Sequence, residues 1–295
     1  MKCPICKIDG KTELQSVWSY YSSLKYKIKK CNKCSLLYTD QNKDLVEKKN
    51  FYKQIYDYSV HESTKGEKLW RIKNTFSKVS ELVKINNNSR VLDIGCMHGF
   101  FLGFLKQKYN CKTIGLETED YYLKKKDKHI NIIKSDLFKF TGMKKNLNQF
   151  DVIIMSHTFE HFPEPMKVLN CIKKLLKKNG KCLIIVPNVE SHLSILSKSF
   201  WGWLQPAAHF FHYSKKSLTK IFNNANFKYK LVSENGGDSL LLALTMINIV
   251  KKNFKKIEKS KYENLRHYFV KIFSAIFRFV YYFGNDEIIY LIEKK

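Results

Sequence analysis

The sequence predicts an α/β fold built around a mainly parallel sheet. Short apolar runs with the length of buried strands alternate with amphipathic stretches with the length of helices. The first such strand lies within residues 90–94, and a turn that contains Gly95 and Gly99 follows it. Repeated strand–helix units of this kind form parallel sheets with right-handed crossovers.

The turn between this strand and the next helix is a candidate ligand site. Glycine lets the backbone come close to a ligand, and free amides at the start of a helix attract anionic groups. Such turns are common in α/β proteins. The pattern therefore becomes informative only together with the residues that follow the later strands.

Later strands place polar side chains at the same edge of the sheet. Glu117, Asp136 and His157 follow successive strands, and ligands of parallel sheets bind at the carboxyl ends of the strands. Glu117 comes about 20 residues after the glycine turn, where an acidic residue can accept hydrogen bonds from ribose hydroxyls. Further strands are predicted at 112–116, 130–133, 150–155 and 181–186, and a helix at 165–178 that ends at Asn179 and Gly180.

Four of the eight cysteines form two Cys-x-x-Cys pairs near the N-terminus, and the residues between the pairs alternate like a β-hairpin. In a reducing compartment, four thiolates with this spacing suit a tetrahedral zinc ion that has no open position for catalysis. We therefore expect residues 1–40 to form a zinc ribbon and residues 41–88 to form a connector with a helix in its second half. The predicted zinc ligands are Cys3, Cys6, Cys31 and Cys34.

Five stretches, in their order and spacing, resemble class I S-adenosylmethionine-dependent methyltransferases: VLDIGCMHGFF, GLETED, SDLFKF, FDVIIMSHTFEHFPEP and LLKKNGKCLIIVPN. The resemblance covers about residues 65–235. It implies S-adenosylmethionine as the cofactor and a Rossmann-like, seven-stranded methyltransferase sheet formed by residues 89–237 and 284–295. The resemblance further implies an antiparallel sixth strand at 228–233 and seventh strand at 287–292, so a helical insertion at 238–283 would precede the last strand.

The same resemblance assigns roles to individual residues. Glu117 would hold the ribose, Asp136 would contact the adenine, and His157 would begin the wall that faces the substrate. Met97 departs from the pattern, because the family usually has a further glycine at this position. The methionine part of the cofactor would lie against Asp93, Gly95, Cys96 and Gly99.

A narrower resemblance predicts the methyl acceptor. The cysteine pairs and residues 201–218 are similar to bacterial methyltransferases encoded with surface-polysaccharide and deoxysugar pathways. This implies O- or C-methylation of a small or lipid-linked sugar or glycan, with His209 and His212 in a loop over the substrate pocket. A ribosomal-RNA methyltransferase and a quinone-type small-molecule O-methyltransferase remain as alternatives. The sequence leaves the acceptor, the methylated atom and the oligomeric state open.

Methyl transfer from a sulfonium is an in-line displacement, and a hydroxyl or carbon acceptor also needs a base. His161 is the predicted base, with His157 and Glu160 beside it after the fourth strand. These residues also resemble the cluster with which quinone O-methyltransferases hold a divalent ion. His157 replaces one carboxylate of that cluster, which disfavours metal assistance. Alternatively, Glu160 and His161 only order their loop through hydrogen bonds.

The net charge of +27 comes almost entirely from lysine. Nucleic-acid sites favour arginine for bidentate contacts, which makes a nucleic-acid partner the less favoured one. The charge is weak evidence for an anionic partner, a membrane or a nucleic acid, and mostly indicates a solvated, lysine-rich exterior. The first residues contain no apolar core of signal-peptide length, so we expect a cytoplasmic protein. The only arginines are Arg71, Arg90, Arg266 and Arg278.

Residues 238–283 are predicted to form two helices, the first beginning near Asp238 and Ser239. Neither apolar run reaches the ~20 residues that span a bilayer. Basic residues beside an aromatic face suit a helix that lies in the interface of an anionic membrane, so we expect a peripheral association with the inner face of the membrane. Packing of this hairpin on the sheet or on a second subunit is the alternative.

Overall fold

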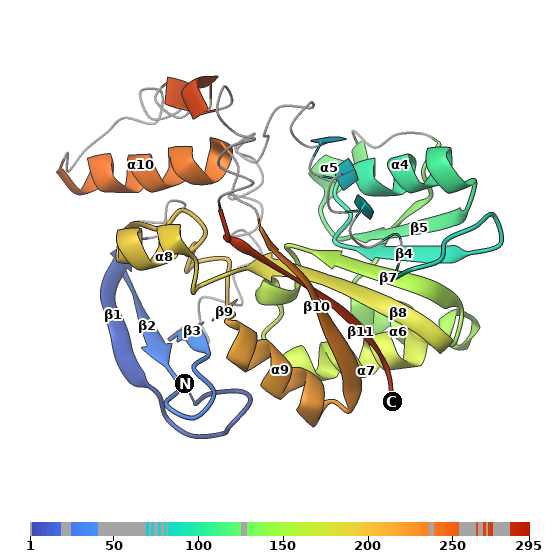
Figure 1. Ribbon diagram of the computed structural model, residues 1–295, viewed down its shortest axis with the longest axis horizontal. Helices are drawn as coiled ribbons and strands as arrows, with labels where there is room; N and C mark the ends of the chain where they lie inside the picture. Colours follow the sequence, from blue (N-terminus) through green and yellow to red (C-terminus); the bar gives the residue numbers. More distant parts are fainter. Residues whose placement is uncertain are drawn as a thin grey trace. The chain divides into compact units, whose positions relative to one another are not determined.

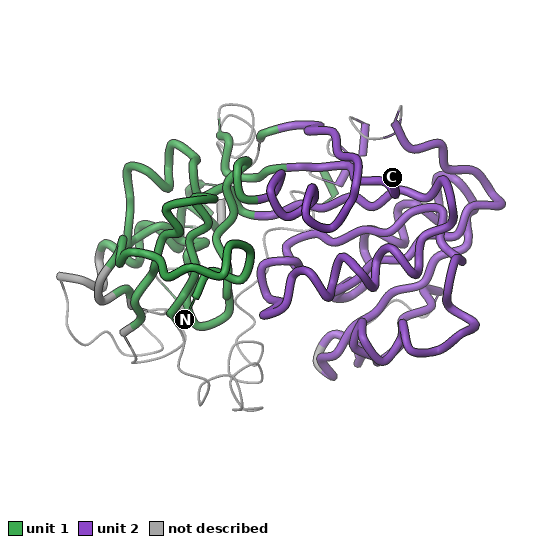
Figure 2. Tube along the Cα trace, turned by 90° about the horizontal axis from the view of Figure 1, so that it is seen from below, with its two compact units in different colours: residues 1–70, 187–217, 234–288 green, residues 71–186, 218–233, 289–295 purple. Residues whose placement is uncertain are grey.

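The protein, described here by a computed structural model, contains two compact units, coloured separately in Figure 2. Unit 1 comprises Met1–Trp70, Pro187–Ser217 and Glu234–Ile288, and unit 2 comprises Arg71–Val186, Leu218–Ser233 and Ile289–Lys295. The domain boundaries expected from the sequence stay a prediction. The structure describes residues 2–18, 25–40, 69–70, 72–73, 76–77, 80, 82–124, 129–235, 239–253, 264, 268–269, 271–273 and 284–295.

Unit 2 is built on a seven-stranded sheet with the strand order β10-β11-β8-β7-β4-β5-β6. The pairs β4–β5, β4–β7, β5–β6 and β7–β8 are parallel, as the alternation of strands and helices predicts. The α/β fold class is therefore confirmed. The strands are β4 (Arg90–Ile94), β5 (Lys112–Glu117), β6 (Ile132–Lys134), β7 (Phe150–Ser156), β8 (Leu176–Pro187), β10 (Phe227–Asn235) and β11 (Glu287–Lys294).

Helices cover both faces of this sheet. Figure 1 shows α4 on one face and α6 and α7 together on the other. On the α4 side, Phe76 is almost fully buried, and its ring contacts those of Phe101, Phe104 and Tyr109. The helices are α4 (Phe100–Tyr109), α5 (Asp120–Lys124), α6 (Leu137–Gly142), α7 (Pro165–Leu175) and α9 (Lys215–Asn224), with the 3-10 turns η2 (Lys144–Asn146) and η3 (Phe159–His161).

The end of α7 differs from the prediction. The helix ends at Leu175 rather than at Asn179 and Gly180, because Leu176 is already extended and pairs with Phe150 of β7. The register of β8 against β7 then shifts between Leu176 and Lys181. A Cβ atom on Gly180 would lie only 2.7 Å from the carbonyl oxygen of Phe150. This glycine therefore permits a close approach between two strands instead of capping a helix.

Unit 1 contains an antiparallel four-stranded sheet in the order β1-β2-β3-β9. The β1–β2 pair confirms the hairpin predicted between the cysteine pairs. The fourth strand comes from far along the chain, since Leu37 pairs with His212 and Tyr38 with Phe211. The strands are β1 (Lys11–Trp18), β2 (Lys25–Lys30), β3 (Leu37–Thr39) and β9 (Phe211–His212).

Unit 1 also contains the helical elements α8 (His192–Ser197), η4 (Lys198–Phe200) and α10 (Ser239–Asn253), and a short helical segment around residue 268. The first helix predicted for residues 238–283 is thereby confirmed, whereas most of the second lies outside the described residues. Leu241 of α10 packs in one core with Trp201 and with Ile28 of the hairpin. Among the helices that the structure describes, none is long and apolar enough to cross a membrane.

Candidate functional site

The turn after β4 adopts left-handed backbone conformations at three positions. Gly95 and Gly99 have φ angles of 74° and 78°, and Met97 has a φ angle of 51°. Only glycine adopts this region without steric cost, and another residue loses roughly 1–2 kcal/mol there. Met97 thus has the left-handed backbone conformation that glycine would adopt, at the position where the family usually has a glycine.

Gly95 is also required by its neighbours. A Cβ atom at this position would lie 2.5 Å from Oγ1 and 2.8 Å from Cγ2 of Thr158. Thr158 belongs to the turn after β7, and its hydroxyl donates to the carbonyl of Ser156 at 3.0 Å. The glycine turn and the turn that carries His157 therefore pack directly against each other.

Glu117 holds the glycine turn from the end of β5. Its Oε2 accepts a hydrogen bond from the Met97 N–H at 2.9 Å, and its Oε1 accepts from Thr118 at 2.8 Å and Glu119 at 3.1 Å. A carboxylate offers about four acceptor positions, so, counting the residues that the structure describes, one position remains on Oε2. Burial raises the pKa of Glu117, although the three amides and nearby His161 oppose this rise.

Asp93 and Asp136 have different surroundings. Asp93, in β4, is buried, and this burial together with the charge of Glu117 raises its pKa to about 8. Asp136 is exposed, and its carboxylate caps α6 by accepting from the Lys139 N–H at 2.9 Å. Cys96 is buried against Gly115, where a Cβ atom would overlap its sulfur.

The turn after β7 brings the predicted base and its neighbours together. His157 has a φ angle of 49°, and its N–H donates to the carbonyl of Ile185 at 2.9 Å. Its Nδ1 lies 3.8 Å from Oε1 of the fully buried Glu160. His161 ends the turn and is partly exposed, and it lies near enough to Glu117 to oppose the rise in the pKa of that carboxyl. The structure thus joins the end of β5 to the turn after β7.

Residues 68–232 match the family described as "Methyltransferase domain". The chain belongs to this methyltransferase family. The match confirms the methyltransferase family that the sequence predicts. An uncharacterized protein of Methanocaldococcus jannaschii is 29% identical in an alignment of 126 residues that covers 39% of this chain and 50% of that protein. The chain thus spans about half the length of this curated relative.

Solved structures share the fold of the methyltransferase. A SAM-dependent methyltransferase from Archaeoglobus fulgidus is 17% identical, with a TM-score of 0.50, over 82% of this chain and all of that one. The YcgJ protein of Bacillus subtilis is 14% identical, with a TM-score of 0.51, over 76% of this chain and 99% of YcgJ. Phosphoethanolamine N-methyltransferase 2 of Haemonchus contortus, in complex with S-adenosyl-L-methionine, is 17% identical with a TM-score of 0.51. The match covers 76% of this chain and 53% of that enzyme. At these identities the likeness concerns the fold.

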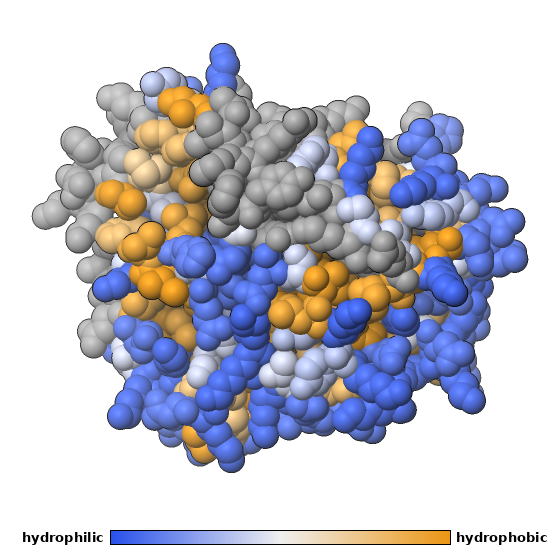
Figure 3. Space-filling view, in the orientation of Figure 1, coloured by the Kyte–Doolittle hydropathy of each residue, from blue (hydrophilic) through white to orange (hydrophobic). Residues whose placement is uncertain are grey.

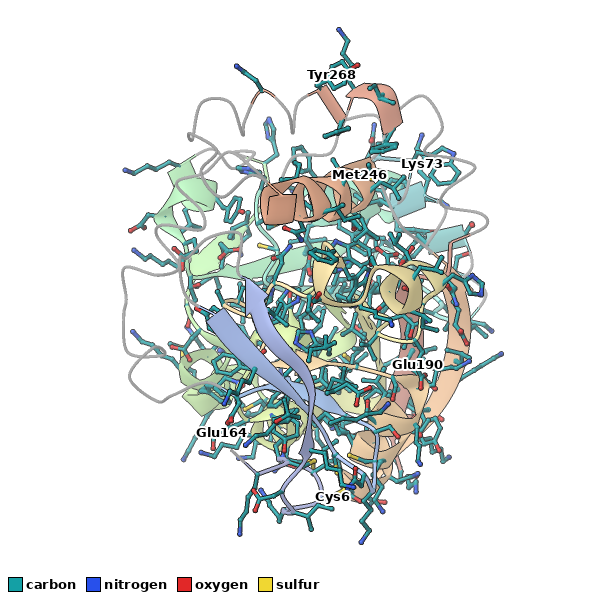
Figure 4. All side chains as sticks on the ribbon, turned by 90° about the vertical axis from the view of Figure 1, so that its left-hand side faces the viewer. Cys6, Lys73, Glu164, Glu190, Met246 and Tyr268 are labelled. Atoms are coloured by element: carbon teal, nitrogen blue, oxygen red, sulfur yellow. The ribbon has the colours of Figure 1, made fainter. Side chains whose placement is uncertain are left out.

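The four N-terminal cysteines of the methyltransferase form one cluster in unit 1, with all four sulfur atoms within 4.8 Å of one another. Their two turns are alike. The N–H groups of Lys7 and Ser35 donate to the carbonyls of Cys3 and Cys31, and both donors are left-handed, with φ angles of 59° and 60°. Figure 4 shows Cys6 at the end of the hairpin where β1 begins.

The sulfur geometry fits a tetrahedral metal ion. Sulfur ligands at about 2.3 Å from zinc lie about 3.8 Å from each other, and Cys3 Sγ lies 3.7 Å from Cys34 Sγ. A hydrogen bond from the Cys34 thiol lowers the pKa of Cys3 to about 5, and the same interaction raises the pKa of Cys34. One thiol of this pair therefore ionises readily, as a metal ligand must.

The two histidines expected in a substrate loop lie buried in unit 1. His209 Nδ1 is 2.8 Å from the carbonyl oxygen of Trp203, and the His209 carbonyl accepts from Thr39 Oγ1 at 2.9 Å. His212 belongs to β9, and burial lowers its pKa to about 3, so the ring is neutral at physiological pH. Their role toward a substrate stays a prediction.

Thr158 is the residue of this site that sequence reasoning missed. It follows His157 in a stretch whose histidines and glutamate carry the predicted chemistry. No spacing rule links Thr158 to Gly95, because the contact joins turns more than 60 residues apart in the chain. The paired glycines of the turn after β4 are the only signal in the sequence that a close neighbour is present.

Proposed function

We propose that the protein transfers a methyl group from S-adenosylmethionine to a small or lipid-linked sugar or glycan acceptor. The observation that carries the cofactor part is the buried Glu117 carboxylate, which binds the amide of Met97 in the glycine turn and keeps one acceptor position on Oε2. The acceptor part rests on the resemblance of the cysteine pairs and of residues 201–218 to sugar-pathway methyltransferases.

The residues around the glycine turn fit such a cofactor. Oε2 of Glu117 would accept a hydrogen bond from a ribose hydroxyl. Asp93, near the end of β4, would lie in the turn around the methionine part of the cofactor. The cofactor, when bound, supplies an electrophilic methyl group on a sulfonium. The proposed cofactor-binding residues are Asp93, Gly95, Cys96, Gly99, Glu117, Asp136 and His157.

The proton of the acceptor would be taken by the turn after β7. His161 is partly exposed, so its ring is accessible to a substrate, and we assign it the role of base. Glu160, buried 3.8 Å from Nδ1 of His157, would orient that ring. The chain's own contribution is thus alignment of the acceptor and removal of its proton.

Zinc is proposed for the cysteine cluster, where it would be structural. The four sulfur atoms fill a tetrahedral coordination sphere. The two cysteine turns have the same backbone geometry. In each, a left-handed residue, Lys7 or Ser35, donates its N–H to the carbonyl of the first cysteine of the pair. A metal held in this way stabilises the fold of unit 1 and takes no part in methyl transfer.

Cofactor binding is tested by calorimetry with S-adenosylmethionine and with its demethylated product. Glu117→Ala should weaken binding by about 1–3 kcal/mol, the usual effect of losing a charged hydrogen-bond partner. Glu119→Ala is the matched control, because its carboxylate lies nearby in the chain but contacts no atom of the glycine turn in the described interactions. Equal affinity of the wild type and Glu117→Ala would contradict the proposed ribose contact, and no binding by the wild type would contradict the cofactor.

The acceptor is tested with radiolabelled cofactor and a panel of sugar nucleotides, lipid-linked sugars, quinones and ribosomal RNA. Label in a sugar-containing product supports the proposal. Label in RNA, with binding that weakens steeply as salt rises, would support the ribosomal-RNA alternative instead. Label in a quinone would support the other alternative.

A further inference from the structure

Unit 1 exposes large apolar side chains on three neighbouring segments. On α8, Ile195 is 59% exposed and Leu196 is 81% exposed. Figure 3 shows hydrophobic residues over α8, over α10 and over the short helical segment around residue 268 on the same face. We call this set the apolar surface of unit 1, and it consists of Ile195, Leu196, Met246, Ile249, Tyr268 and Ile272.

The exposed residues of α10 are not needed for the core of unit 1. Leu241 and Leu244 are buried, and Thr245 donates to the Leu241 carbonyl and accepts from the Gly202 N–H. Met246 and Ile249 are three residues apart and lie outside this contact, each 38% exposed. Figure 4 shows Met246 on α10 and Tyr268 on the next helical segment. Met246 and Ile249 thus lie on the side of α10 that faces away from these buried residues.

The charge of these segments is one-sided. Residues 239–273 contain eight lysines and arginines against two glutamates, a net charge of +6, and residues 192–200 add Lys198 without an acidic residue. Lys271 lies between Tyr268 and Ile272 and is exposed with them. Large apolar side chains beside lysines suit the surface of an anionic membrane. The apolar side chains can enter the boundary of the acyl chains, while the lysine ammonium groups bind lipid phosphates.

We propose that the apolar surface of unit 1 docks on an anionic lipid bilayer, with the Ile195–Leu196 tip of α8 entering the interface beside the exposed side of α10. The surface adds α8 to the segment expected from the sequence. It does not span the bilayer, because α8 has only six residues and α10 has fifteen. This proposal is separate from the proposed methyl transfer, because the exposed side chains lie in unit 1 and the glycine turn in unit 2.

The test is flotation of the full-length protein with vesicles of phosphatidylcholine alone and of phosphatidylcholine with phosphatidylglycerol. The wild type should float with the anionic vesicles at low salt and lose most of this binding at high salt. Ile195→Asn with Leu196→Asn should lower the partition coefficient by roughly tenfold or more. The matched control is Met143→Asn with Leu231→Asn, which removes two apolar side chains of 39% exposure from unit 2.

Thermal melting and cofactor calorimetry check that the variants fold and bind ligand as the wild type does. Absence of the wild type from the floated fraction would overturn the proposal, as would equal flotation of the wild type and the α8 variant. Self-association that the α8 variant abolishes, without any flotation, would also overturn it and identify a second copy of the chain as the occupant. Lys198→Glu with Lys271→Glu should reduce flotation with anionic vesicles, and an unchanged result would contradict the charge argument.

Discussion

Gly95→Ala tests whether the glycine turn and the turn after β7 act as one unit. An alanine at a φ angle of 74° loses roughly 1–2 kcal/mol through backbone strain. Its methyl group would also lie 2.5 Å from Thr158 Oγ1 and 2.8 Å from Cγ2, and overpacking of this kind costs about 1–3 kcal/mol. The expected loss in the free energy of unfolding is therefore about 2–5 kcal/mol, with a parallel loss of cofactor affinity.

A double-mutant cycle separates the two contributions. Thr158→Ala removes both crowding atoms, and it also removes the hydrogen bond to the Ser156 carbonyl, which is worth about 1 kcal/mol. In the double variant the overlap disappears, and only the backbone strain of an alanine in place of Gly95 remains. Urea denaturation should therefore show a favourable coupling of about 1–3 kcal/mol between the two substitutions.

Gly103→Ala is the control for this cycle. Gly103 lies within α4, and a Cβ atom there would make only an ordinary contact with Ile130 at 3.7 Å. Alanine is the better helix former, so this variant should be more stable by about 0.5–1 kcal/mol. If the effects of Gly95→Ala and Thr158→Ala simply add, the two turns are not coupled through this contact and the reasoning is refuted.

Three further predictions concern the cysteines, the base and Asp93. Cys31→Ser should release one zinc ion per chain, measured by metal analysis, and change the fluorescence of Trp201 and Trp203, which share a core with the hairpin; full metal content in the variant would contradict a four-cysteine site. His161→Ala should abolish turnover of the acceptor and leave cofactor affinity nearly unchanged, whereas a retained kcat would exclude it as the base. The pKa of Asp93 is raised from 3.8 to about 8, so the folded state holds a proton that the unfolded state loses first. The stability of the wild type should therefore fall between about pH 4 and pH 8 relative to Asp93→Asn, and identical pH profiles in urea denaturation would contradict this.

The first five strands of the sheet could be predicted because each is a short, mainly apolar run between clear breaks, and apart from the start of β8 their ends differ from the structure by at most two residues. The last two strands, β10 and β11, were expected from the family resemblance. The end of α7 could not be predicted, because the local sequence at Asn179 and Gly180 is typical of a helix C-cap. Their actual role depends on the distant Phe150. Local sequence signals thus identified the element correctly, and a tertiary contact decided its boundary.

The candidate site was predictable to a similar extent. Glu117 and His157 follow predicted strands, so their place at strand ends could be expected from the sequence. The structure adds that Glu117 binds the glycine turn and that this turn packs on Thr158, the residue after His157. Residues 201–212 show the limit of this approach. Their aromatic and histidine side chains suggested a substrate loop, whereas His212 lies in a two-residue strand that pairs with Leu37. A pairing of two residues leaves no periodic pattern in the sequence.

The pairing of β3 with β9 has a consequence for the order in which the protein is made. Chains emerge from the ribosome from the N-terminus onward, so Leu37 and Tyr38 leave it long before their partners His212 and Phe211. During that interval the early three-stranded sheet has an unpaired edge, which favours contact with other nascent chains. The four cysteines all belong to the part that emerges first. Capture of a metal ion at that stage would order the early sheet and hold its open edge in place until the fourth strand arrives.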